Sequence, residues 1–119
     1  MNFEKVKELV LEWADDKDLL NSENADTQFM KFIEEVFEFK TEMDLYFYHS
    51  DVLKDVNKEH MKDEMGDIFV TLIILCEDLG IDPVVCLEMA YKKISKRQGK
   101  TINGNFYKQE DLEGMEWQK

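Results

Sequence analysis

The sequence predicts an all-α protein: a four-helix bundle with a short C-terminal tail, formed as one domain over residues 1–119. The length allows a single hydrophobic core but no second one. Five glycines and one proline leave few turn residues, which favours a small number of long helices. Apolar residues recur three and four positions apart along most of the chain, which is the period of an amphipathic helix.

The first two helices are expected over residues 1–20 and 26–48. Apolar residues such as Phe3, Val6 and Trp13 place one side of the first helix on a core. Candidate caps in the break between the helices are Ser22, Asn24 and Asp26. The second helix has a wide apolar face, and one border of that face collects Gln28, Lys31, Glu35, Glu38 and Glu42. A site at the edge of the core is expected along this border.

Two further helices are expected over residues 51–79 and 83–98. Ser50-Asp51 is a start signal for the third helix, and Gly80 is suited to end it. Asp82-Pro83 then combines a capping residue with a proline at the first helical position. Beyond the fourth helix, residues 100–119 lose the helical period. Asn103-Gly104 predicts a turn there, so the tail is expected to be irregular or a small hairpin.

The third helix is apolar on nearly every side between Ile68 and Cys76. A helix of this kind is buried all round, and a small bundle achieves this most easily by self-association. A homodimer or homotetramer is therefore expected. Trp13, Phe29, Phe32, Tyr46 and Tyr91 could stack on a nucleobase, but aromatic residues at helical spacing lie more often in the core, where most of them are expected.

The charge balance excludes some partners. The formal net charge is −12, so the surface repels nucleic acid and anionic membranes. An anionic substrate must therefore meet a local positive charge or a metal ion. Cys76 and Cys86 match no zinc spacing and are expected to be small buried side chains in a reducing compartment. The N-terminal residues are charged where a signal peptide is apolar, so a cytoplasmic protein is expected.

Two carboxylate pairs carry the strongest chemical signal. Glu35 and Glu38 lie three residues apart in one helix, and Glu64 and Asp67 do so in another, so each pair projects from one side of its helix. Facing each other, the pairs repel unless a cation lies between them. Oxygen ligands favour Mg²⁺ or Mn²⁺. A di-iron bundle is disfavoured because neither histidine belongs to a Glu-x-x-His pair. The alternative is a charged, solvated rim.

A basic cluster in the fourth helix contrasts with the acidic chain. It consists of Lys92, Lys93, Lys96, Arg97 and Lys100, without an acidic residue among them. Cations at a helix C-terminus complement the helix dipole, and spacing alone favours this interpretation. The functional alternative is a clamp on phosphate oxygens.

Together these residues resemble a known family. Gln28-x-x-Lys31-x-x-Glu34-Glu35-x-x-Glu38, followed by Glu64-x-x-Asp67, is similar to the EExxE and ExxD signature of the MazG-like all-α nucleoside triphosphate pyrophosphohydrolases. Shorter similarities at Glu12-Trp13-Ala14, Ala90-Tyr91 and Asn103-Gly104-x-Phe106 resemble the short MazG-like proteins of phages and bacteria.

The resemblance implies an oligomeric, Mg²⁺-dependent enzyme that cleaves a nucleotide between its α and β phosphates. Carried over by position, the metal ligands are Glu35, Glu38, Glu64 and Asp67, and Mn²⁺ is a second candidate ion. The resemblance implies that Glu34 is an outer metal ligand or orients the attacking water. Together with Glu35 and Glu38, it forms the expected catalytic group. The residues expected to bind the phosphate groups of the substrate are Lys31, Lys93 and Arg97, with Lys96 and Lys100 as further candidates.

The sequence leaves two alternative functions open. One is a catalytically silent helical interaction module that has kept the fold. The other is a narrower relative, such as a dUTPase or a phosphoribosyl-ATP pyrophosphohydrolase. Neither the base nor the sugar of the substrate follows from a spacing rule.

Overall fold

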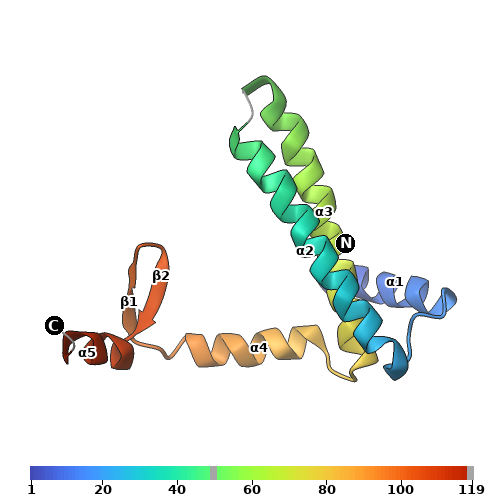
Figure 1. Ribbon diagram of the computed structural model, residues 1–119. Coiled ribbons are helices and arrows are strands. Elements are labelled where there is room, and N and C mark those ends of the chain that lie inside the picture. The colour runs from blue at the N-terminus through green and yellow to red at the C-terminus, as the bar shows by residue number, and fades with distance from the viewer. Residues whose placement is uncertain (49–50, 118–119) are drawn as a thin grey trace. The chain divides into compact units, whose positions relative to one another are not determined.

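The computed structural model describes residues 1–48 and 51–117 and is mostly helical (Figure 1). Its elements are α1 (Phe3–Asp16), the 3₁₀ helix η1 (Ser22–Asn24), α2 (Ala25–Tyr48), α3 (Asp51–Asp78), α4 (Pro83–Ile94), β1 (Gly99–Ile102), β2 (Asn105–Lys108) and α5 (Gln109–Trp117). The prediction of a helical protein is confirmed, with a small two-stranded sheet in addition. The chain divides into two compact units, Met1–Pro83 and Val84–Lys119.

A long hairpin of two helices forms the first unit. Figure 1 shows α2 and α3 side by side along most of their length, and α1 packs against α3. Apolar side chains that are almost completely buried in this unit are Ala14, Ile73, Ile74 and Cys76. Because α2 and α3 run in opposite directions, residues early in α2 lie opposite residues late in α3. This pairing brings Glu35 opposite the region of Glu64 and Asp67.

Two helices end in the same hydrogen-bonded motif. At the end of α3, Gly80 has φ of 70°, its N–H donates to the Glu77 carbonyl, and the Ile81 N–H donates to the Cys76 carbonyl. This is the Schellman motif that the predicted stop at Gly80 requires. Helix α1 ends in the same way at Asp18, whose φ is 59°. The predicted end near residue 20 is therefore too late, because aspartate replaces the glycine that normally marks this position.

The predicted helix starts have different outcomes. Asn24 does not cap α2 but donates its side-chain amide to the Leu19 carbonyl, and Ser22 belongs to η1. Helix α3 begins at Asp51, while the predicted cap Ser50 lies outside the described residues. Helix α4 begins at Pro83 as expected and ends at Ile94, four residues before the predicted end. There the Ser95 hydroxyl donates to the Lys92 carbonyl, and the chain turns towards β1.

Several side chains predicted to be buried are exposed in the single chain. In the apolar run of α3, Ile73, Ile74 and Cys76 are buried, but Phe69 is 46% exposed. Trp13, Phe29 and Tyr91 are also exposed, as is Cys86. The single chain therefore does not bury these side chains. Their burial by self-association stays a prediction.

The second unit contains the predicted hairpin and an unpredicted helix. Strands β1 and β2 pair antiparallel, with Gly99 opposite Lys108 and Ile102 opposite Asn105. Asn103 and Gly104 both have positive φ, 51° and 82°, as a two-residue type I′ turn requires. Helix α5 then follows β2 directly, so an irregular end to the tail is wrong. Its apolar pattern is weak, and Leu112 is its one buried residue where burial is described.

No helix in the described part of the chain is both long enough and apolar enough to cross a membrane.

Candidate metal centre

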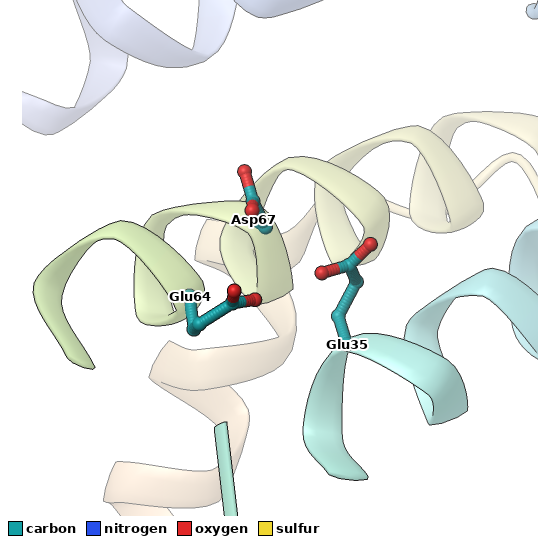
Figure 2. A group of neighbouring side chains, drawn as sticks. All are labelled: Glu35, Glu64 and Asp67. Carbon is teal, nitrogen blue, oxygen red and sulfur yellow. The ribbon is translucent and has the colours of Figure 1, made fainter. Parts of the chain in front are cut away.

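Three carboxylates from two helices meet in the first unit. Glu35 projects from α2, whereas Glu64 and Asp67 project from successive turns of α3. Each residue offers one oxygen, and these three oxygens lie within 4.8 Å of one another. Figure 2 shows Glu35 and Glu64 reaching toward each other from the two helices, with Asp67 one turn along. The structure thus brings together three of the four predicted metal ligands.

The fourth predicted ligand, Glu38, is placed differently. Its side chain is exposed and does not belong to the group of three close oxygens. It still acts on Glu64, because a side-chain hydrogen bond with Glu38 and the negative charge of Glu38 both help to raise the pKa of Glu64.

Two carboxylates of the group have buried oxygens that lack hydrogen-bond partners among the described residues. Glu35 is only 6% exposed, and its Oε2 atom is buried without a hydrogen-bond partner among the described residues. The same is true of Oε2 of Glu64. An unpaired buried carboxylate oxygen is costly, by about 1–3 kcal/mol or more, and a metal ion would provide the missing partner. An all-oxygen donor set fits Mg²⁺ or Mn²⁺.

The pKa values of the cluster are raised. Burial, the hydrogen bond with Glu38 and the negative charges of Glu38, Asp67 and Glu35 raise the pKa of Glu64 to about 7. The pKa of Asp67 is also above its ordinary value, because of partial burial and the charges of Glu35 and Asp63, although Lys31 opposes this effect. The cluster therefore resists carrying its full negative charge near neutral pH unless a cation is present.

The raised pKa of Glu64 gives a prediction for the metal-free protein. A carboxyl group whose pKa rises from 4.5 to about 7 on folding contributes stability fully below pH 4.5, and loses that contribution as the pH rises through about 7. Glu64→Gln keeps a neutral donor toward Glu38 and should remove this dependence. In EDTA, the free energy of unfolding of the variant relative to wild type should therefore increase from about pH 5 to about pH 8.

Urea unfolding of both proteins over this pH range measures the difference. A parallel pH dependence of the two proteins would contradict a raised pKa of Glu64.

Two predicted polar residues border the cluster. The Lys31 ammonium lies 3.5 Å from a Glu35 oxygen and 3.7 Å from a Glu34 oxygen. Each of these glutamates follows Lys31 by one turn of α2. The hydrogen bond to Glu35, together with the charges of Glu35 and Glu34, raises the pKa of Lys31, so it stays a cation. Lys31 is about half exposed and so remains accessible to a ligand.

A pocket of about 590 Å³ opens beside the carboxylates. Glu35 and Asp67 line it together with Lys31 and Glu34, and apolar side chains form much of the remaining wall. Trp13 of α1 is among these side chains. Most aromatic residues at helical spacing were expected in the core, because spacing alone does not distinguish a tryptophan in a pocket wall from one in a core.

The predicted phosphate-binding residues Lys93 and Arg97 lie in the second unit, and their role stays a prediction. Together with Lys96 they line a cavity of about 470 Å³. Lys108 of β2 also lines this cavity and was not among the predicted residues, because only the hairpin brings it there. Lys100 lies on β1, one residue after Gly99.

The comparisons with known proteins give no relative. A scan against protein-family models finds none that matches the chain, and searches of curated proteins and of solved structures find no match either.

Proposed function

We propose that this protein is a Mg²⁺-dependent nucleotide pyrophosphohydrolase of the MazG-like type. The observation that carries the proposal is the group of Glu35, Glu64 and Asp67, whose oxygens converge beside a pocket large enough for a small molecule. Two of these carboxylates have a buried oxygen without a hydrogen-bond partner among the described residues, and a bound cation would supply one. The EExxE and ExxD resemblance, which includes the same carboxylates, supports the same function.

Each side chain of the cluster has a role in this proposal. Glu35, Glu64 and Asp67 would hold the divalent cation, and Glu38 would be the fourth ligand that the resemblance implies. Bound Mg²⁺ supplies positive charge that neutralises phosphate oxygens and makes water more acidic. Without the cation, burial and the neighbouring negative charges disfavour the charged form of Glu64 and raise its pKa.

Lys31 and Glu34 act on the substrate and on water. The Lys31 ammonium is available for a phosphate oxygen, and its contacts with Glu34 and Glu35 orient both carboxylates. Glu34 is exposed and lines the pocket, where it can accept a hydrogen bond from the attacking water. Lys93 and Arg97 are proposed to neutralise further phosphate charge, as the resemblance implies.

The reaction is a hydrolysis without a redox step. A water oxygen forms a bond to the α phosphorus, and the bond from that phosphorus to the oxygen bridging the α and β phosphates breaks. The products are a nucleoside monophosphate and pyrophosphate, and the proton lost from water passes to a carboxylate and then to solvent. Positive charge is needed locally, because the chain as a whole has a net charge of −12.

The resemblance also implies a biological setting. In this proposal the protein is a cytoplasmic homodimer or homotetramer in nucleotide metabolism, and it removes ribo- or deoxyribonucleoside triphosphates from the nucleotide pool. The acidic surface disfavours nucleic acid as a partner.

The test is pyrophosphate release from a panel of ribo- and deoxyribonucleoside triphosphates, with Mg²⁺ and with EDTA. Release that requires Mg²⁺ and falls in Glu38→Gln is expected. A folded wild-type protein that releases pyrophosphate from no nucleotide would contradict the proposal and would favour a silent interaction module. Activity confined to one nucleotide would identify a narrow enzyme such as a dUTPase.

A further inference from the structure

The pocket beside the carboxylates is lined by both charged and apolar side chains. The charged groups include Lys31, Glu35 and Asp67, and the apolar side chains include Trp13, Leu19 and Met30. A ligand with a charged part and a largely apolar part suits this lining. The pocket lies entirely within the first unit.

Gln28 is the unusual residue of this pocket. It lines the pocket and is only 6% exposed, yet its amide makes no hydrogen bond with any other described residue. The N and O atoms of this amide are not fully enclosed, unlike the unpaired buried oxygens of Glu35 and Glu64. Its unpaired amide is thus accessible from the pocket rather than sealed in the core. A buried amide without a partner is costly unless a ligand or water bonds to it.

The order of residues along α2 matches the order of groups in a nucleotide. Gln28, Lys31 and Glu35 follow at intervals of three and four residues, so they form one stripe on the helix. From Gln28 to Glu35 this stripe extends for about 10 Å, at 1.5 Å per residue. With phosphate at the Lys31 and Glu35 end, the opposite end of a bound nucleotide reaches the amide.

An amide is suited to the edge of a nucleobase. It presents a carbonyl acceptor beside an N–H₂ donor, and nucleobases carry neighbouring donors and acceptors on their edges. An aromatic ring such as Trp13 provides a face for stacking that tolerates every base. Trp13 is half exposed in the pocket wall, which leaves ring surface available.

We propose that this pocket binds the nucleobase of the substrate, with Gln28 bonding to the base edge and Trp13 stacking on its face. The inference rests on the proposed function for the placement of the phosphates. It assigns Gln28 as a residue that determines affinity for the base and has no role in the chemistry at phosphorus.

The test is equilibrium binding of nucleoside monophosphates, which requires no turnover. Trp13 serves as the reporter in a Trp117→Phe background, where it is the remaining tryptophan. Quenching of its fluorescence on titration is expected, with affinities confirmed by calorimetry. Gln28→Leu should weaken binding about tenfold, since one or two hydrogen bonds are lost. Thr41→Val, on the same helix but outside the pocket, should bind as wild type.

Inorganic tripolyphosphate is the second probe, because it has phosphates but no base. Its binding in the presence of Mg²⁺ should be the same in wild type and Gln28→Leu. Equal weakening for nucleotide and tripolyphosphate would overturn the base-binding role, as would unchanged nucleotide binding in the variant. If Gln28→Leu does not fold, the wild-type titration still decides, because an unquenched Trp13 at saturating nucleotide overturns the proposal.

The two proposals fail in different ways. If nucleotide binding depends on Gln28 but no pyrophosphate is released, the proposed activity is contradicted and the base-binding pocket is supported. If Gln28→Leu releases pyrophosphate with wild-type Michaelis constants for every nucleotide, the activity is supported and the base-binding role is contradicted.

Discussion

Replacing Glu35 by glutamine is expected to reduce pyrophosphate release by roughly a thousandfold. Glu35 is the most buried member of the carboxylate group and the one that α2 contributes to it. The amide of glutamine keeps the shape but removes a negative ligand, so Mg²⁺ binds poorly. Metal ions contribute several kcal/mol to the stabilisation of developing charge, and each 1.36 kcal/mol corresponds to a tenfold change in rate.

The matched control is Glu59→Gln. Glu59 lies on α3, is exposed, and contacts Lys62 rather than the cluster. Its substitution should leave pyrophosphate release within about twofold of wild type, since surface changes of this kind have small effects. The Glu35 variant should remain folded and, in EDTA, should be at least as stable as wild type because one repulsive charge is gone. A Glu35→Gln protein with full activity would exclude this carboxylate as a metal ligand.

Mg²⁺ is expected to stabilise the folded protein strongly. A ligand that binds only the native state at one hundred times its dissociation constant adds about 2.7 kcal/mol to the free energy of unfolding. For a domain of about 100 residues, this corresponds to a rise in melting temperature on the order of 10 °C. The physical reason is that desolvation and mutual repulsion, which raise the pKa values of Glu64 and Asp67, are both offset when a cation binds.

Asp67→Asn should reverse the order of stability. Without Mg²⁺ the variant should melt above wild type, because it carries less repulsion, and with Mg²⁺ it should melt below. Thermal unfolding with MgCl₂, and with NaCl at equal ionic strength, separates specific binding from charge screening. An equal gain for wild type and variant, or an equal gain from NaCl, would contradict a metal site at Asp67.

Much of the fold was predictable because its signals are local. Gly80 ends α3 in the predicted position, and Asn103-Gly104 forms the predicted turn, since both depend on backbone conformations that few residues adopt. Asp18 was missed because it adopts the same conformation without being glycine. Helix α5 was missed because its burial depends on a few contacts with the hairpin rather than on an apolar stripe.

The site was predictable in part for a similar reason. Helical spacing placed Glu35 on one border of α2 and Glu64 with Asp67 on one side of α3, and the structure brings these three together. Spacing does not give the offset between two packed helices, so it did not separate the exposed Glu38 from the group. Pocket residues such as Trp13 and Gln28 depend on how α1, α2 and α3 meet, which only the tertiary structure shows.

The most direct test of the central claim is product analysis in ¹⁸O-labelled water. Wild-type protein with Mg²⁺ and the nucleoside triphosphate panel should yield monophosphate and pyrophosphate in equal amounts, with the label in the monophosphate alone, because water attacks the α phosphorus. Label in pyrophosphate, release of orthophosphate, or no hydrolysis of any nucleotide by the folded protein would contradict the account.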